Sequence, residues 1–297
     1  MKSKDLRTKQ ARTGVSSNTC SATFEILANL GNNQENIVNV FTDDKGDIQC
    51  IFVQLADQRM LYQKYGKVLQ LDGTHNITQL SMPLYTLIVQ DNFGVGQPVG
   101  FFFVREETEA IIATGLKYFC NNNDNSITEI FLTDKDCWEI SAIKDKFHRS
   151  THMLCHFLAP RAVDRKLYTT DLSVGFKAEI YEVFKEALYA TIDNKFVEAL
   201  EYLCALVDWN LGAYFDTHWF SPRWVKSWPM KERQQLCTLG NNTMHRIKRY
   251  FYNKKISTKN NSFVYTYHLT IKNVVKKKGK KFNTVHLSYS PILLTTF

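Results

Sequence analysis

The chain has 297 residues, of which 44% are hydrophobic and 13% aromatic, so it can bury one large core or two modest ones. Its apolar runs are only a few residues long, and its first residues lack the apolar stretch of a signal peptide. Seven scattered cysteines without a C-x-x-C pair argue against a disulfide framework. We therefore expect a nuclear or cytoplasmic protein that is neither secreted nor bound to a membrane.

The positive charge is concentrated near the C-terminus. Residues 233–297 contain 13 of the 37 Lys and Arg residues and no Asp or Glu, so 24 basic and 29 acidic residues precede them, with a net charge of −5. Aromatic residues are interleaved with these cations between 250 and 267. Such a segment suits a polyphosphate through counterion release and stacking. A solvated basic face or a nuclear-import signal at 276–281 is the alternative.

The N-terminal part predicts a polar arm followed by a helix and a strand. Residues 1–22 are rich in Ser, Thr, Lys and Arg, which is typical of a disordered arm. The apolar run at 24–30 predicts a short helix, and DDKGD at 43–47 predicts a hairpin turn. QCIFVQLA then predicts a strand at 49–56, which passes into a helix at 57–66.

Three strands separated by turn residues come next. They are VLQLD at 68–72, PLYTLIVQD at 83–91 and PVGFFFVR at 98–105. Consecutive strands at this spacing predict an antiparallel meander.

Helices and strands alternate after the meander. The stretch 107–120 predicts an amphipathic helix, and it is followed by a strand at 129–134, a helix at 137–147 and a strand at 151–158. The order of three strands, helix, strand, helix, strand is that of the RNase H-like fold, an α/β fold with a mixed sheet. Its parallel part requires right-handed crossovers through the two helices.

The pattern from 162 to about 214 is helical throughout, with apolar residues three and four apart. This predicts an all-helical insertion. We therefore expect an RNase H-like core at 23–158, the insertion at 159–230, and a closing helix with a basic tail at 231–297.

An aspartate stands at the end of each of two apolar strands, Asp72 in KVLQLDGTH and Asp134 in EIFLTDKD. Carboxylates at strand ends are rigid oxygen ligands that can hold Mg²⁺ or Mn²⁺ ions about 3.5–4 Å apart on either side of a phosphate. Taken singly, an aspartate at such a place is more often a turn or helix cap. Asp136 and Glu139 are expected to begin the next helix, where acids favour the N-terminus.

The runs QCIFVQLADQRMLYQKYGKVLQLDGTH, MPLYTLIVQDNFGVGQPVGFFFVREETEAI, FLTDKDCWEISAIKDKF and LCHFL resemble Mutator-like element (MULE) transposases. Within that group, about residues 35–250 are most similar to the RNase H-like domain of zinc-finger SWIM-domain-containing proteins. The resemblance implies that Asp72 and Asp134 are the first and second catalytic aspartates. They would ligate Mg²⁺ or Mn²⁺ if the protein is active, and otherwise no cofactor is expected.

The chain departs from the family's pattern at two places. The family has a Cys, two residues and a His after the fifth strand, whereas this chain has Cys155 and Leu158, with His156 nearby. The family's third acid follows an Asn-Asn pair by three residues, and in LGNNTMHRIKRYF that position is His245. An imidazole prefers softer ions than Mg²⁺ and brings no negative charge. Loss of one such donor is expected to lower the rate of cleavage by at least about 10²–10³-fold.

Other residues of interest favour structural roles. We expect His75 to be a surface residue rather than a phosphate ligand, and Cys155 to be a small buried apolar residue. The tryptophans of the stretch after the insertion helices are expected to anchor one subdomain to another rather than to stack on bases. They are Trp209, Trp219, Trp224 and Trp228. The SWIM zinc finger that follows the domain in the resembled proteins has no counterpart here, because no cysteine follows Cys237.

The sequence thus predicts a transposase-derived RNase H-like protein that has lost cleavage activity and binds DNA with low affinity and little sequence preference. The main alternative is an active metal-dependent endonuclease or transposase whose site is completed by Glu198, Glu201 or Asp208. A protein-interaction module or a degenerate gene product is the other. The residues expected to bind nucleic acid are Arg246, Lys248, Arg249, Lys254, Lys255, Lys276, Lys277, Lys278, Lys280 and Lys281.

Overall fold

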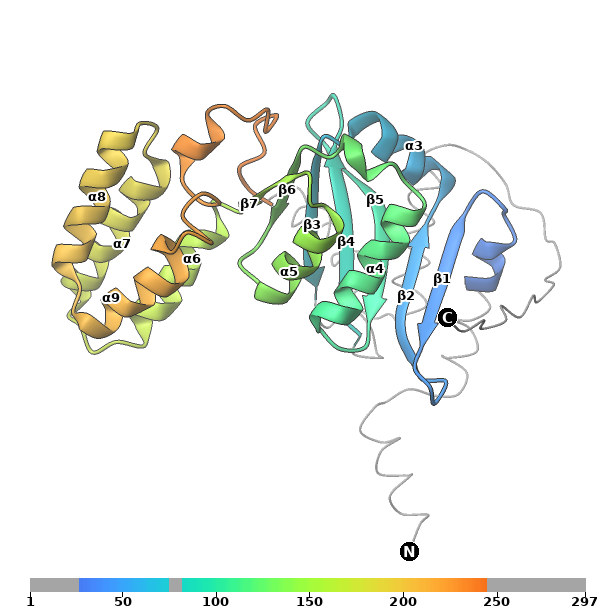
Figure 1. Cartoon of the computed structure of the whole chain (residues 1–297), viewed down its shortest axis with the longest axis horizontal. Helices are drawn as coiled ribbons and strands as arrows, with labels where there is room; N and C mark the ends of the chain where they lie inside the picture. The colour runs from blue at the N-terminus through green and yellow to red at the C-terminus, as the bar shows by residue number, and fades with distance from the viewer. Residues whose placement is uncertain (1–26, 75–81, 245–297) are drawn as a thin grey trace, which may run out of the picture.

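A computed structural model describes residues 27–74 and 82–244 of the chain. Its centre is a seven-stranded mixed sheet with the strand order β1-β2-β5-β4-β3-β6-β7 (Figure 1). The strands are β1 Ile37–Thr42, β2 Ile48–Gln54, β3 Val68–Thr74, β4 Leu84–Gln90, β5 Gly96–Val104, β6 Ile130–Thr133 and β7 Thr151–Leu154. The predicted RNase H-like α/β class is confirmed by this arrangement. The expected polar arm lies outside the described residues.

The antiparallel half of the sheet follows the predicted meander. Strand β4 pairs with β3 on one side and with β5 on the other, and β5 continues to β2 and β1. The β1–β2 hairpin turns where DDKGD was predicted to turn. There Asp43 Oδ1 accepts hydrogen bonds from the amides of Lys45 and Asp47, and Gly46 adopts the positive φ of 81° that the turn requires.

The parallel half of the sheet is made by β3, β6 and β7, which are connected by helices. Helix α4 (Glu109–Asn121) begins after Thr108, whose side chain accepts a hydrogen bond from the Ile111 amide. Helix α5 (Cys137–Lys146) begins after Asp136, whose carboxylate accepts from the amides of residues 138 and 139. Both helices lie where the sequence predicts them. A third helix, α3 (Ala56–Tyr65), joins β2 to β3.

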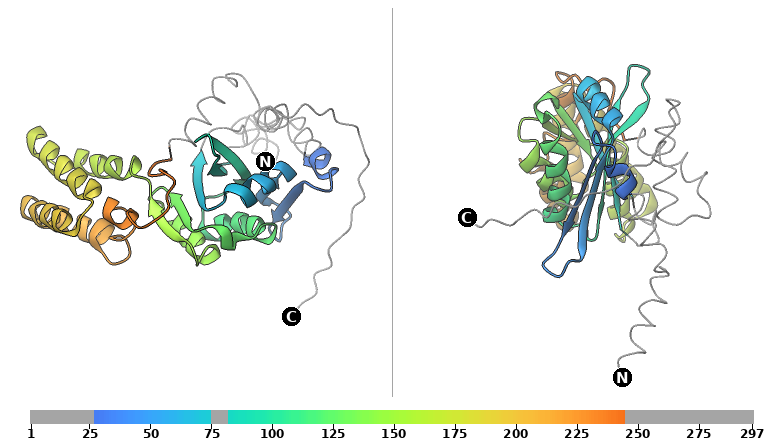
Figure 2. Two further views of the ribbon diagram at one scale, coloured as in Figure 1. Left: turned by 90° about the horizontal axis from the view of Figure 1, so that it is seen from above. Right: turned by 90° about the vertical axis from the view of Figure 1, so that its right-hand side faces the viewer.

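Helices α4 and α5 cover one face of the sheet (Figure 2). Their apolar side chains pack with the strands into one cluster of buried residues, in which Ile112, Leu116 and Ile143 meet Phe102 and Phe131. The opposite face carries two smaller clusters, one over β2, β4 and β5 and one over β6, β7 and the start of β3. The side chains of the inner strands, such as β4 and β6, therefore alternate between two buried surfaces.

Four α-helices follow β7 within the described residues and form a layer beside the β7 end of the sheet (Figures 1 and 2). They are α6 Leu158–Tyr168, α7 Val174–Tyr189, α8 Asp193–Leu206 and α9 Trp209–Phe215. This helical layer has its own core, in which the Phe184 ring stacks on Trp228 with centroids 5.1 Å apart and meets Trp219 edge-on at 4.9 Å. None of the helices in the described ranges is both long and apolar enough to cross a membrane.

Strand β7 is shorter than the sequence predicts. It ends at Leu154, and the predicted strand residues 155–158 instead turn into α6. The end of the strand is held by the chain that returns from the helical layer: the Leu154 amide donates to the Ser227 carbonyl at 2.8 Å, and the Leu154 carbonyl accepts from the Arg233 guanidinium. The apolar run LCHFL does not distinguish a strand from the entry to a helix.

Close packing of α4 on the sheet depends on Gly115. A Cβ at this position would lie 2.4 Å from the Phe102 ring. Gly115→Ala should therefore lower the free energy of unfolding by about 1–3 kcal/mol, since overpacking outweighs the gain in helix propensity. Urea unfolding of the purified variants measures this.

The matched control is Gly175→Ala in α7, where a Cβ would meet nothing within 4 Å. It should leave stability unchanged or raise it by up to about 1 kcal/mol. Equal effects of the two substitutions would contradict the packing of α4 described here.

Candidate functional site

The two strand-end aspartates lie on neighbouring strands. Strand β3 pairs in parallel with β6, with Val68, Leu69 and Gln70 opposite Ile130, Phe131 and Leu132. The same register, continued by two residues, places Asp72 level with Asp134. Neighbouring strands are about 4.8 Å apart, so the two aspartates stand side by side at the carboxyl end of the parallel strands. The predicted adjacency of these strands is confirmed, and the role of the two residues as metal ligands stays a prediction.

Asp72 faces away from α4 and α5, and Asp134 directly follows β6. Side chains alternate along a strand, so Asp72 shares a face with Val68 and Gln70. Val68 and Leu132 belong to the same buried cluster, on the sheet face opposite the two helices.

A buried hydroxyl stands opposite Asp72. Thr86 is its cross-strand partner on β4, and the Thr86 side chain is fully buried. Its Oγ1 has no hydrogen-bond partner within the described part of the chain. A polar hydroxyl group therefore lies beside Asp72 on the neighbouring strand β4.

Glu139 is the residue whose role the sequence analysis missed. It lies in the first turn of α5, as predicted, but its side chain is only 6% exposed and is joined to the Thr133 hydroxyl by a short hydrogen bond of 2.5 Å. Burial raises its pKa well above the usual value, although the bond to Thr133 opposes this shift. The charges of Asp134, Asp136 and Asp72 raise the pKa further. Glu139 is therefore a buried acid beside the aspartate pair, and its surroundings disfavour the charged carboxylate.

The Thr133 hydroxyl lies between Glu139 and the backbone of Asp134. It donates to the Glu139 carboxyl at 2.5 Å and also lies 3.3 Å from the Asp134 carbonyl oxygen. This chain of bonds ties the first turn of α5 to the backbone of Asp134.

A second acid, Glu107, borders the same end of the sheet. The Tyr85 hydroxyl donates to Glu107 at 2.9 Å, and burial together with the charges of Glu139 and Glu107 raises the pKa of Tyr85. Gly73 lets the Tyr85 ring approach the strand, because a Cβ there would lie 3.1 Å from the ring. In the Asp-Gly pair at 72–73, Asp72 thus supplies a carboxylate and Gly73 leaves room for the Tyr85 ring.

Within the described residues, the side chains around Asp72 and Asp134 supply fewer metal ligands than a two-metal site requires. Asp72 and Asp134 supply two carboxylates, whereas Glu139 is buried and bound to Thr133. Residues 27–74 and 82–244 contain no group of three or more His, Cys, Asp or Glu side chains placed to hold a metal ion. These residues alone therefore do not fit a pair of metal ions.

The acids of the helical layer do not join the aspartate pair. Glu198 and Glu201 are exposed on α8, which lies on the far side of the layer from the sheet (Figure 1). Asp208 caps α9, where it accepts a hydrogen bond from the Leu211 amide at 2.8 Å. These three residues therefore do not supply a third ligand beside Asp72 and Asp134.

The chain returns to the sheet through the Asn-Asn pair. Asn241 is buried and its Oδ1 accepts from Gln70 Nε2 of β3 at 2.9 Å. Asn242 accepts from the His156 amide through its backbone carbonyl, and the fully buried Met244 packs against β3, β6 and β7. A turn with Leu239 and Gly240 at positive φ, 52° and 72°, leads into this segment. The segment thus docks on the sheet face that carries Asp72.

His245 is the next residue in the chain and lies outside the described residues, as does His75. The same holds for the predicted nucleic-acid-binding residues, which all fall between 246 and 281.

Cys155 and His156 have structural roles. Cys155 is buried, as predicted, and its sulfur accepts a hydrogen bond from the Met244 amide at 3.2 Å. His156 Nε2 lies 2.7 Å from the Trp228 carbonyl oxygen, and burial lowers its pKa to about 3. The neutral imidazole therefore donates to that carbonyl and ties the end of β7 to the helical layer.

The tryptophans divide into two groups. Trp219, Trp224 and Trp228 are buried, which agrees with the predicted anchoring role, whereas Trp209 is 88% exposed at the start of α9. The exposed Trp209 does not anchor the layer to the sheet.

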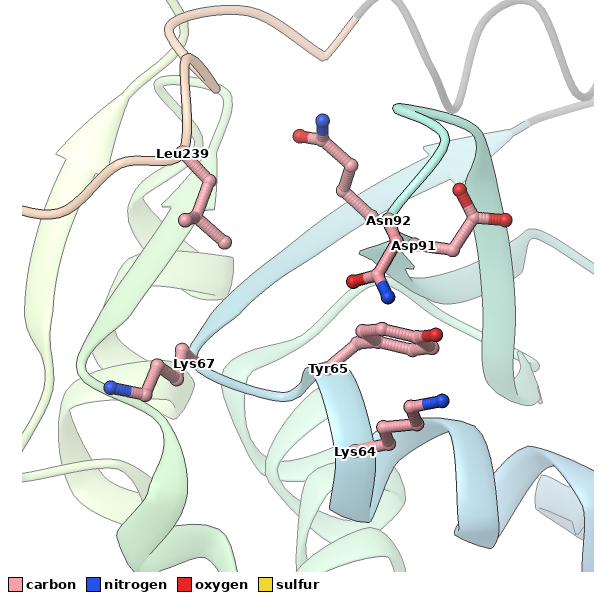
Figure 3. A pocket seen from close by; sticks show the side chains of 7 residues that line it. Lys64, Tyr65, Lys67, Asp91, Asn92 and Leu239 are labelled. Atoms are coloured by element: carbon pink, nitrogen blue, oxygen red, sulfur yellow. The ribbon is translucent and has the colours of Figure 1, made fainter.

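A shallow cleft of about 390 Å³ lies elsewhere on the core (Figure 3). It is lined by Lys64, Tyr65, Lys67, Gln90, Asp91, Asn92 and Leu239. Because Lys67 precedes β3 and Asp72 lies near its other end, roughly five residues or 17 Å separate the cleft from the aspartate pair. Lys67 also forms an ion pair with Glu129 at 3.0 Å. The cleft is therefore separate from the candidate site.

Replacement of Glu139 by glutamine tests the raised pKa of this residue. Because folding raises its pKa, Glu139 stabilises the protein below its unfolded pKa of about 4.3 and loses this contribution as pH rises toward the folded value. The wild type should therefore lose stability relative to Glu139→Gln over this range, by about 1.4 kcal/mol per pH unit.

Urea unfolding of both proteins between pH 4 and pH 8 measures the difference. Glu109→Gln, an exposed position in the first turn of α4, is the control and should show no such trend. A pH-independent difference between wild type and Glu139→Gln would mean that Glu139 is charged in the folded protein.

The comparison with protein families covers the sheet and its helices. Residues 28–153 match the family model described as "Zinc finger SWIM domain-containing protein 1/3, RNaseH-like domain". The match begins before β1 and ends within β7, the last strand of the sheet. It includes both Asp72 and Asp134. This part of the chain therefore has the RNase H-like fold and is similar to the RNase H-like domain of that SWIM-protein family.

Proposed function

We propose that the chain is a transposase-derived protein of the MULE type that binds nucleic acid without cutting it. The observation that carries the proposal is the placement of Asp72 and Asp134 at the carboxyl ends of two adjacent parallel strands in an RNase H-like sheet. In this fold, that is where a phosphodiester is held between carboxylate-bound metal ions.

The proposed loss of cleavage rests on the third ligand. The Asn241–Met244 segment docks on the face of the sheet that carries Asp72, and the residue after it is His245 instead of an acid. No Asp or Glu occurs in the 233–297 sequence. Two carboxylates and an imidazole bring too little negative charge to hold a pair of hard dications. The protein would thus keep the fold and two aspartates of a nuclease site and lack the negative charge that holds the metal ions.

The proposed partner is DNA, bound with low affinity and little sequence preference, with the nucleus as the expected compartment. The 13 basic residues of 233–297 support this partner, since the same segment has no acids to pair with them. An active endonuclease is the second candidate, favoured by the retained Asp72 and Asp134. A protein-interaction module is the third.

Substitution of the third-ligand position tests the proposed inactive site. His245→Glu should bind Mn²⁺ at least about tenfold more tightly than the wild type, because it adds a carboxylate to Asp72 and Asp134. Isothermal titration calorimetry with Mn²⁺ measures both affinities. The wild type should show no Mg²⁺- or Mn²⁺-dependent cleavage of a labelled DNA duplex.

The control is His245→Glu combined with Asp72→Asn, which should return Mn²⁺ affinity to that of the wild type. Equal Mn²⁺ binding by wild type and His245→Glu would show that residue 245 is not the third ligand. Cleavage by the wild type would reject the proposed inactivity and favour the endonuclease.

The salt dependence of binding tests the basic segment. If Lys276, Lys277 and Lys278 contact phosphates, the slope of log affinity against log salt should be about 0.9 less steep for each contact removed. Fluorescence anisotropy with a labelled duplex, for the wild type and a variant with the three lysines changed to glutamate, gives both slopes.

A triple change of Lys45, Lys117 and Lys195 to glutamate is the charge-matched control, because all three are exposed on the core and the helical layer. It should preserve more of the wild-type slope than the Lys276–Lys278 variant. A wild-type protein that binds no duplex at 50 mM salt would remove DNA as the partner.

A further inference from the structure

A lysine next to Asp134 is held by the helical layer. The Lys135 ammonium lies 4.7 Å from the centroid of the Trp219 ring and 5.0 Å from that of Trp224. Lys135 stands between Asp134 and Asp136, the cap of α5, whereas both rings belong to the core of the helical layer. A cation over the face of a tryptophan ring is attracted by the negative face of the ring. The turn that carries Asp134 is thereby fixed to the layer.

The contact with Lys135 continues into a line of cations and rings. The Arg223 guanidinium lies 4.9 Å from the same Trp224 ring, and the Lys166 ammonium lies 5.4 Å from the Tyr214 ring. Trp219 and Tyr214 are joined by a hydrogen bond of 3.2 Å from Nε1 to the hydroxyl.

These contacts form a line across the boundary between the sheet and the helical layer. Its members, in order, are Arg223, Trp224, Lys135, Trp219, Tyr214 and Lys166.

The cations of this line stand close enough to repel one another. Burial lowers the pKa of Lys144, and the charge of Arg223 lowers it further. His218, whose ring lies 4.9 Å from Tyr214, has a pKa lowered by burial and then by Lys135 and Lys166. We call Lys135, Lys144, Lys166 and Arg223 the cationic rim. The electrostatic potential along the rim is thus positive.

The four cations of the rim make no direct ion pair with an acidic side chain. None of them forms a salt bridge within residues 27–74 and 82–244, although ion pairs occur elsewhere in these ranges, as between Lys67 and Glu129. Like charges held near one another oppose folding, and an external anion would relieve their repulsion. The rim is therefore suited to bind an extended anionic partner.

The burial of the rings decides which part of such a partner is contacted. Trp219 is fully buried and Trp224 is 4% exposed, so neither offers a face on which a base could stack. Arg223 and Lys144 are exposed, and a ligand would meet their charged groups. Contacts of this kind reach phosphates and carry no base information. We infer that the cationic rim binds the phosphodiester backbone of a nucleic acid and leads the strand past Asp134.

This inference rests on the proposed function and locates the nucleic acid within it. The rim starts one residue from Asp134, so a strand bound there would run along the joint toward the aspartate pair. An acidic peptide is the competing partner. The nucleic acid is favoured because the rim adjoins the strand ends where an RNase H-like fold holds a phosphodiester.

The test removes charge from the rim in the full-length protein. Lys144→Gln, Lys166→Gln and Arg223→Gln are combined, and Lys135 is retained because it packs between two rings. Affinity for a labelled duplex and a labelled single strand is measured by anisotropy between 50 and 200 mM salt. The slope should fall by up to about 2.7 for the duplex and about 2.1 for the single strand, at 0.9 and 0.7 per contact.

Two controls separate charge from folding and from general electrostatics. The variant Lys144→Arg, Lys166→Arg, Arg223→Lys keeps every charge and should keep the wild-type slope. The variant Lys45→Gln, Lys117→Gln, Lys195→Gln removes three exposed lysines outside the rim and should also keep the wild-type slope. A rim variant with the wild-type slope, in a protein that binds DNA, would overturn the inference and leave the proposed function intact.

Two further outcomes are decisive. A wild-type protein that binds neither duplex nor single strand at 50 mM salt would overturn both the inference and the proposed function. If the neutral rim variant loses affinity for polyglutamate while its affinity for both nucleic acids is unchanged, the rim serves an acidic peptide and the inference fails.

Discussion

The parallel pairing of β3 with β6 is the constraint on which the rest of the candidate site depends. Because both strands run in the same direction, their carboxyl ends meet at one end of the sheet, and the register brings Asp72 level with Asp134. An antiparallel pair would have separated the two residues by the length of a strand. The crossover through α4 makes this pairing possible, and the close approach of Gly115 to Phe102 sets how tightly that helix covers the sheet.

Two further interactions hold the Asp134 turn from opposite sides. On the α5 side, the buried carboxyl of Glu139 reaches the Thr133 hydroxyl. On the side of the helical layer, Trp219 and Trp224 hold the Lys135 ammonium. A backbone fixed in this way loses little entropy when it meets a ligand. The turn that carries Asp134 is therefore preorganised to meet a ligand.

The order of elements could be predicted from the sequence because local patterns carry it. The meander at 68–105 has alternating apolar runs and Gly-containing turns, and the helices at 109–121 and 137–146 begin at Thr108 and Asp136. The end of β7 could not be predicted, since LCHFL is apolar throughout and its break depends on contacts of His156 with the distant Trp228.

The candidate site was predicted in part for the same reason. Asp72 and Asp134 were found because strand ends are visible in the sequence. The burial of Glu139 was not, because the pattern D-x-x-E indicates a capping acid and says nothing of a neighbouring hydroxyl on β6. The contact of Lys135 with Trp219 joins residues far apart in the chain, and it has no local signal at all.

The hydrogen bonds made by the Leu154 backbone matter for the behaviour of the sheet as an isolated fragment. An edge strand normally offers free amide and carbonyl groups that invite another strand to add. At the end of β7, the Leu154 amide and carbonyl are both engaged, one by Ser227 and one by Arg233, which come from the returning chain. A fragment that stopped where the family match stops, at 153, would lose these partners and the cover that Met244 gives to Met153. The helical layer and its return segment thus protect the core from edge-to-edge aggregation, whatever they bind.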